Sequence, residues 1–161
     1  MSRLAVYAGS FDPITLGHLD VAIRASHLFD RVIVAVGENP AKRYLLSLEQ
    51  RMDVVRAATA QLPNVSVEVF RGLLVHFCQA RGASVIVRGL RAVTDFEFEF
   101  QIGLANMDMA PGVETVFLLT DPRHIFISSS LVKEIASNGG DVSRYLPEVA
   151  ATALREALER R

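Results

Sequence analysis

Several short apolar runs in this sequence contain almost no polar residue, and they constrain the fold more than any other feature. The clearest is RVIVAV at 31–36. A strand with one solvated face would alternate apolar and polar residues, so an uninterrupted run predicts a strand that is buried on both faces. Both faces become buried when parallel strands are covered by helices on the two sides of the sheet. The sequence therefore predicts an α/β protein.

Expected strands and helices alternate along the chain, without an internal repeat or a linker. The strands are expected at 4–8, 31–36, 65–70, 83–87 and 113–119. Helices are expected at 17–29, 47–62, 73–80, 129–137 and 147–159, the second of them opened by a capping box of Ser47 and Gln50. This order predicts one doubly wound domain over residues 1–161, with a five-stranded parallel sheet and right-handed crossovers.

The segment DFEFEF at 95–100 fits this alternation less simply, because its strict alternation is typical of a half-buried strand. However, residues 94–109 contain no proline and Gly103 as their one glycine. Thr94 could cap a helix, and Phe96 and Phe100 would then share one of its faces. We interpret the segment as a helix.

Composition argues against several classes of protein. The net charge is −1, so the chain has no basic field that would attract nucleic acid. No apolar run reaches the length that spans a bilayer, and the apolar stretch near the N-terminus is too short for a signal peptide. The one cysteine, Cys78, lies in an apolar run and is expected to be a buried hydrophobe rather than a nucleophile. A cytoplasmic protein is expected.

Chemistry is expected where the strands end, because open parallel sheets bind ligands at the carboxyl ends of their strands. GSFDPITLGH at 9–18 follows the first strand. Gly9 allows a ligand to approach the backbone, and Thr15 can cap a helix whose first turn contains His18. A helix N-terminus favours phosphate, and His18 adds a donor. A plain strand–turn–helix junction is the alternative. No Gly-Lys-Ser/Thr follows, which excludes a kinase-type P-loop.

Cations and hydroxyls follow the other strands. Lys42 and Arg43 follow the second strand, and Arg88 and Arg91 flank a glycine after the fourth. The arginines could hold a phosphate chain or could form ion pairs with acidic residues at 95, 97 and 99. Serines at 128–130 open a helix and predict a second anion site, and His124 could stack on a base. No set of residues has the spacing of a structural zinc site.

Four motifs together resemble bacterial phosphopantetheine adenylyltransferases: GSFDPITLGH, PAK, RGLRAVTDFEFE and FISSSLVKEIA. The element Thr-x-Gly-His alone marks the nucleotidyltransferase superfamily, whereas the second half of this set is more specific. The resemblance covers almost the whole chain. It implies a Rossmann-like homohexamer that uses Mg²⁺, transfers the adenylyl group of ATP to 4′-phosphopantetheine and binds coenzyme A as a feedback ligand. The products would be dephospho-CoA and pyrophosphate.

The resemblance also implies roles for individual residues. His18 would stabilise charge on the α-phosphate, without a general base or a covalent intermediate. The residues implied to bind the acceptor are Ser10, Lys42, Leu74, Arg88 and Asn106. Those implied to bind ATP are Ser10, Phe11, His18, Gly89, Leu90, Arg91, Glu99, His124, Ile125, Phe126, Ile127, Ser128, Ser129 and Ser130.

The sequence departs from the family at two positions, where His124 replaces a frequent aromatic residue and Phe98 a frequent tyrosine. Two other functions remain open. An enzyme of the same superfamily could use nicotinate mononucleotide or glycerol 3-phosphate, although such relatives more often have a histidine where Thr15 stands. A nucleotide-binding regulator without turnover would need the phosphate-binding turns but not Lys42.

Overall fold

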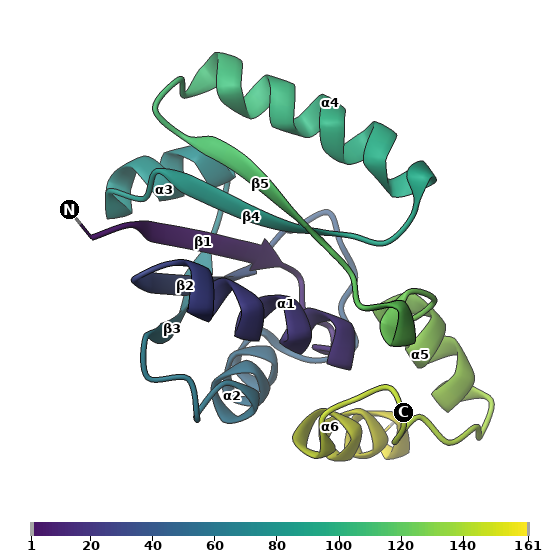
Figure 1. The fold of residues 1–161 in the computed structure, drawn as a ribbon. Helices are drawn as coiled ribbons and strands as arrows, with labels where there is room; N and C mark the ends of the chain where they lie inside the picture. Colours follow the sequence, from purple (N-terminus) through teal and green to yellow (C-terminus); the bar gives the residue numbers. More distant parts are fainter. Residues whose placement is uncertain (1, 161) are drawn as a thin grey trace.

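A computed structural model describes residues 2–160 and contains one five-stranded parallel sheet with helices on both faces (Figure 1). The order of strands across the sheet is β3-β2-β1-β4-β5. This arrangement confirms the predicted doubly wound α/β sheet. The strands are β1 (Leu4–Gly9), β2 (Arg31–Gly37), β3 (Val65–Phe70), β4 (Val85–Leu90) and β5 (Glu114–Leu119).

The central strands are buried on both faces, as their apolar sequences predict. All side chains of β2 after Arg31 are buried, and so are those of β1 up to Ala8. β3 and β5 lie at the two edges and are only partly buried. The helices that connect and cover the strands are α1 (Leu16–Leu28), α2 (Leu48–Ala58), α3 (Leu74–Arg81), α4 (Val93–Met109), the short 3₁₀ helix η1 (Pro122–His124), α5 (Ser129–Ser137) and α6 (Glu148–Glu159).

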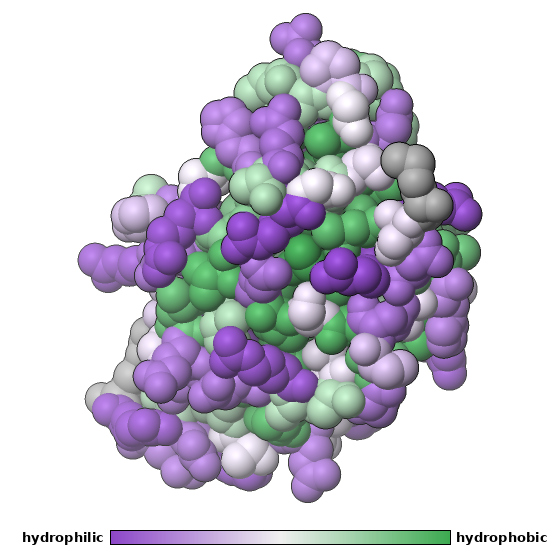
Figure 2. Space-filling view, turned by 90° about the vertical axis from the view of Figure 1, so that its left-hand side faces the viewer, coloured by the Kyte–Doolittle hydropathy of each residue, from purple (hydrophilic) through white to green (hydrophobic). Residues whose placement is uncertain are grey.

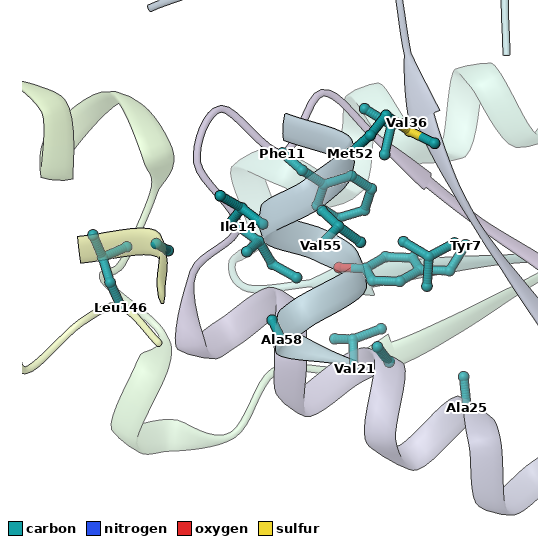
Figure 3. Close-up of a cluster of buried hydrophobic side chains, with 14 of the residues drawn as sticks. Tyr7, Phe11, Ile14, Val21, Ala25, Val36, Met52, Val55, Ala58 and Leu146 are labelled. Atoms are coloured by element: carbon teal, nitrogen blue, oxygen red, sulfur yellow. The ribbon is translucent and has the colours of Figure 1, made fainter. Parts of the chain in front are cut away.

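Two apolar cores lie on opposite faces of the sheet. The larger contains Tyr7 and Val34 from the sheet, packed against α1, α2, α5 and α6. Figure 3 shows part of this core, with Phe11 lying close to side chains of α2. The smaller core contains Val6 and Ile33 and packs against α3. Alternate residues of the same strands therefore supply the two cores.

The topology creates a crevice at one end of the sheet. The chain runs outward from β1 to β2 and β3, and then returns across β1 to β4 and β5. β1 therefore pairs on one side with β2 and on the other with β4, with Tyr7 opposite Val34 and Val87. The loops after β1 and β4 diverge from this switch point, and ligands of open α/β sheets bind there.

The boundaries of three elements differ from those expected by two residues or more. α2 ends at Ala58 rather than near Leu62, because Thr59 is the C-cap and a turn leads directly into β3. β4 continues to Leu90, three residues beyond the expected end, because it stays paired with β5. The expected cap at Thr94 is wrong: α4 begins at Val93, after Ala92, which makes no side-chain capping bond.

The helical interpretation of residues 95–100 is confirmed. Phe96 and Phe100 lie on one face of α4 with their rings stacked, 5.5 Å between centroids. Phe96 also contacts Phe117 of β5 edge-on. The alternating sequence leaves Phe98 64% exposed.

The two ends of the sheet differ in shape. Figure 2 views the end where the strands begin, and hydrophobic residues lie there between hydrophilic ones. The cavity described below lies at the other end, where the strands stop. No helix within residues 2–160 is both long enough and apolar enough to cross a membrane.

Candidate active site

A cavity of about 680 Å³ lies at the carboxyl ends of the strands and contains most of the residues predicted to bind substrates. The predicted residues that line it are Ser10, Phe11, His18, Lys42, Leu74, Arg88, Gly89, Arg91, Glu99, Ile127, Ser128 and Ser129. The predicted residues outside its lining are Leu90, Asn106, His124, Ile125, Phe126 and Ser130. The lining also includes residues that the sequence did not single out, among them Tyr7, Asn39, Tyr44, Phe70 and Thr120.

His18 is fixed by the helix that it belongs to. Thr15 is the N-cap of α1, and its side-chain oxygen accepts a hydrogen bond from the His18 backbone N–H at 3.2 Å. In return the Thr15 backbone N–H donates to Nδ1 of His18 at 3.0 Å. Because Nδ1 accepts this bond, the ring hydrogen is on Nε2, which is left to donate. The predicted capping role of Thr15 is confirmed.

The imidazole is neutral at physiological pH. Burial, together with the positive charges of Arg91 and Arg88, lowers the pKa of His18 to about 4. A protonated ring would also carry a hydrogen on Nδ1 and would lose the bond from Thr15. His18 therefore contributes a fixed, uncharged N–H donor.

Phe11 packs against the histidine ring. Its backbone has φ of 48°, in the left-handed region that residues with a side chain seldom adopt. This conformation buries the ring, which meets Tyr7 and His18 edge-on at centroid distances of 5.5 and 5.2 Å. Gly9 leaves the space for it, because a Cβ atom there would lie 3.0 Å from the Phe11 ring.

Arg88 forms an ion pair at the centre of the cavity wall. Its Nε and one terminal nitrogen donate to the two oxygens of Glu99, at 2.8 and 2.6 Å, and the other terminal nitrogen donates to the carbonyl of Ala8 at 3.0 Å. Burial opposes its charge, but the hydrogen bonds and charge of Glu99 outweigh burial and raise the pKa of Arg88. Arginine has five N–H groups, so two remain for a ligand. The ion pairing considered as an alternative is present, and it still leaves donors for phosphate.

Arg91 connects the two halves of the site. It donates to the backbone carbonyl of Ile127 at 2.8 Å and pairs with Asp95 at 3.2 Å. The end of β4 is thereby tied to the turn that opens α5. In that turn Ser128 caps the helix by accepting from Leu131 N–H. Ser129 donates its hydroxyl to the carbonyl of Pro13 at 2.8 Å, which joins this turn to the loop after β1.

Lys42 is the cation on the opposite side of the cavity. It lies in the loop after β2 and makes no ion pair with a carboxylate of residues 2–160. Arg51 lies beneath this loop, only 1% exposed, and donates to the carbonyls of Ser10 and Gly37 at 2.8 Å each. Its guanidinium stacks on Tyr44 at 3.8 Å from the ring centroid. One buried cation thus donates hydrogen bonds to two backbone carbonyls from different segments.

The remaining candidate groups are not arranged for catalysis. Cys78 is fully buried, and burial raises its pKa to about 11, so it is the apolar core residue that was predicted. No group of three or more His, Cys, Asp and Glu side chains in the described part of the chain could hold a metal ion.

Comparison with known proteins gives consistent matches. The family model described as cytidylyltransferase-like matches residues 6–135. A phosphopantetheine adenylyltransferase of Heliobacterium modesticaldum is 53% identical over 153 residues, covering 95% of this chain and 91% of that protein. One from Caldanaerobacter subterraneus subsp. tengcongensis is 49% identical over 158 residues, covering 98% and 99%. A putative nicotinate-nucleotide adenylyltransferase from Vibrio parahaemolyticus, 22% identical, has the same fold, with a TM-score of 0.70 over 100% of this chain and 97% of that structure.

Proposed function

The chain belongs to the phosphopantetheine adenylyltransferases of the cytidylyltransferase-like family, and from this premise we propose that it transfers the adenylyl group of ATP to 4′-phosphopantetheine. The products are dephospho-CoA and pyrophosphate. Identities of 49–53% over nearly the full length support this acceptor over the one named for the structural neighbour, because 22% identity supports a common fold alone.

One observation carries the chemical part of the proposal: a neutral histidine held by its own helix cap, with one N–H left to donate at the N-terminus of α1. Charge on the non-bridging oxygens of the α-phosphate must be stabilised while the adenylyl group is transferred. The Nε2–H of His18 and the partial positive charge at the N-terminus of α1 supply this stabilisation.

The acceptor brings its own nucleophile. An oxygen of the 4′-phosphate bonds to the α-phosphorus, the bond from that phosphorus to the α–β bridging oxygen breaks, and pyrophosphate leaves with both bonding electrons. A phosphate is already ionised at neutral pH, so no residue must remove a proton. The protein positions the reactants and stabilises charge. No covalent intermediate forms.

The two substrates occupy different sides of the cavity. Ser10, Lys42, Leu74 and Arg88 bind 4′-phosphopantetheine, with Lys42 as a point charge on its phosphate. Gly89, Arg91, Glu99 and residues 127–129 bind ATP. Mg²⁺ enters with ATP, held by phosphate oxygens and water, which suits its octahedral preference. This way of binding Mg²⁺ suits the cavity, because its carboxylates Glu99 and Asp95 already form ion pairs with arginines.

Six further residues contact the same two substrates, although they lie outside the cavity lining: Leu90, Asn106, His124, Ile125, Phe126 and Ser130. His124 is the one that could stack on adenine. Coenzyme A, which shares the acceptor's pantetheine arm, acts as a feedback ligand at the same cavity.

The protein acts in the cytoplasm as a homohexamer. Exposed apolar side chains along α4 support self-association, because apolar patches of this kind mark interaction surfaces. They include Val93, Phe98, Leu104, Met107 and Met109. Mass photometry or light scattering measures this state directly, and a monomer at micromolar concentration would refute it.

Pyrophosphate release tests the reaction. The chain is incubated with MgATP and 4′-phosphopantetheine, and in parallel with nicotinate mononucleotide or glycerol 3-phosphate. Release with phosphopantetheine alone, together with an equal amount of dephospho-CoA, is expected. Release only with another acceptor would keep the chemistry and reject the acceptor. ATP binding without release in any reaction would favour a non-catalytic regulator.

A further inference from the structure

Asp12 is a buried carboxylate next to the site that the proposed reaction does not use. It is 3% exposed and follows Ser10 and Phe11 in the loop after β1. Transfer of an ionised carboxylate out of water is unfavourable unless charge and hydrogen bonds compensate it. The partners of Asp12 therefore indicate what this position does.

Three donors from two other segments converge on this carboxylate. Oδ1 accepts from the backbone N–H of Leu46 at 2.9 Å, and Oδ2 accepts from the backbone N–H of Leu45, also at 2.9 Å. Oδ2 also accepts from Nζ of Lys133 in α5, at 3.0 Å. Leu45 and Leu46 are 33 and 34 residues away in the chain, and Lys133 is 121 residues away. Asp12 thus joins the segments that carry both sides of the site.

The loop that carries Lys42 depends on this connection at its C-terminal end. At its beginning, Glu38 N–H donates to the carbonyl of Phe70 at 3.1 Å. Within the loop, Lys42 N–H donates to the carbonyl of Asn39 at 3.0 Å. Three residues after Lys42, the bonds to Asp12 fix the backbone before α2 begins. The loop is also held by Tyr44, whose hydroxyl accepts from Asn39 N–H at 2.9 Å, so the bonds to Asp12 are one of the ties that set where Lys42 lies.

We propose that Asp12 is a positioning residue that sets the place of Lys42 relative to the reacting phosphates through the amides of Leu45 and Leu46, with Lys133 as its counter-charge and its tie to α5. This proposal rests on the proposed function, because it assigns Lys42 to the acceptor phosphate. Asp12 itself is not among the residues that line the cavity.

Asp12→Asn is the main test. An asparagine keeps one oxygen that can accept a hydrogen bond. Its other terminal atom is an NH₂ group, which cannot accept from the N–H donors that the second carboxylate oxygen now binds. Hydrogen bonds to a charged group contribute enough that the KM for 4′-phosphopantetheine should rise about tenfold or more. The KM for ATP should rise by no more than about three- to fivefold, because the pair with Lys133 is weakened while the contacts of Arg91 and Ser129 with the rest of the site remain. Glu68→Gln, which breaks the exposed pair with Arg81, is the control and should change neither KM.

A double-mutant cycle separates positioning from general stability. In a Lys42→Ala background, Asp12→Asn should raise the acceptor KM no further, because its effect acts through the removed ammonium. An equal rise in both backgrounds would overturn the proposal, and so would an acceptor KM for Asp12→Asn within twofold of the unmodified chain.

Lys133→Met tests the contact between Asp12 and α5, and it gives a result even if Asp12→Asn does not fold. It leaves both amide bonds in place, so the acceptor KM should not change. The KM for ATP should rise about three- to fivefold, the size expected for a partly exposed charge pair, because α5 loses one tie to the loop after β1. A rise in the acceptor KM alone would contradict the arrangement.

Hydrogen exchange gives a readout that does not depend on turnover. In Asp12→Asn, amides at 39–46 should exchange faster, while those of the central strands β1 and β2 stay protected. Unchanged exchange at 39–46, or faster exchange everywhere, would overturn the positioning role. Absence of pyrophosphate release by the unmodified chain would instead refute the proposed function, and the exchange result would still decide the role of Asp12.

Discussion

Replacing His18 with alanine removes both of its roles, the helix cap and the donor to the α-phosphate, and the sizes of the two effects distinguish them. The substitution removes the Nδ1 acceptor for Thr15 N–H and the Nε2 donor together. Loss of a capping interaction costs about 1 kcal/mol of stability. A domain with a typical stability of about 5–15 kcal/mol would remain almost fully folded after such a loss. Unfolding therefore cannot account for a large fall in activity.

The catalytic effect should be much larger than the structural one. Removal of one donor to a developing oxyanion lowers kcat by about 100- to 1,000-fold. We expect a fall of that size in His18→Ala, measured as pyrophosphate release at saturating substrates and with the folded fraction checked by circular dichroism. A kcat within about tenfold of the unmodified chain would refute the assigned role.

The pH dependence tests the protonation state. Because the pKa of His18 is about 4, the ring stays neutral from pH 8 down to about pH 5, and its contribution to kcat should be constant over that range. A contribution that disappears as pH rises through 6–7 would mean that the charged ring is the active form, and the argument from Thr15 would be wrong. Folding stability should fall as pH drops from 6.5 towards 4, because only the unfolded chain takes up the proton there. His18→Ala should reduce this fall.

Three further substitutions test other parts of the site. Lys42→Ala should raise the KM for 4′-phosphopantetheine about tenfold or more and change the KM for ATP little, because a charged hydrogen bond to the acceptor phosphate is lost. Equal effects on the two KM values in steady-state kinetics would contradict the assignment of Lys42 to the acceptor. Gly9→Ala should force the Phe11 ring against its neighbours, lower the stability by about 1–3 kcal/mol in urea and reduce kcat, whereas an unchanged urea midpoint would show that the ring can move aside. Arg51→Met should destabilise the chain by about 1–3 kcal/mol, because the carbonyls of Ser10 and Gly37 lose the hydrogen bonds from its guanidinium. A more stable variant in the same titration would show that relief of the buried charge dominates.

The central sheet could be predicted because burial on both faces leaves a simple trace in the sequence. β1 and β2 lie between two cores, so almost every position in them must be apolar. Local capping could also be predicted, because a capping box depends on residues that are only three positions apart. The capping box of Ser47 and Gln50 is present as expected. The start of α4 was misjudged because packing against β5, rather than a side-chain cap, fixes it.

The site could be predicted in part. Residues that follow strands, together with residues implied by the family resemblance such as Leu74 and Glu99, account for the twelve predicted residues that line the cavity. The contacts between these residues could not be predicted, because they join segments of the chain that lie close together only as a result of the order of strands in the sheet. Arg88 had three acidic candidates within 95–99, and only the geometry of α4 selects Glu99. Asp12 was passed over because its partners lie 33 or more residues away and two of them are backbone amides.

The bond from Ser129 to Pro13 joins residues that are 116 positions apart, and this has a consequence for synthesis of the chain. The ribosome makes the loop after β1 well before the serine turn, because 116 positions separate Pro13 from Ser129. β1 must also wait for β4 to fill its second edge. A nascent chain that stops before α5 would lack the contacts of Ser129 and Lys133 with the loop after β1 and would not catalyse adenylyl transfer. Activity should therefore appear only after α5 has been synthesised.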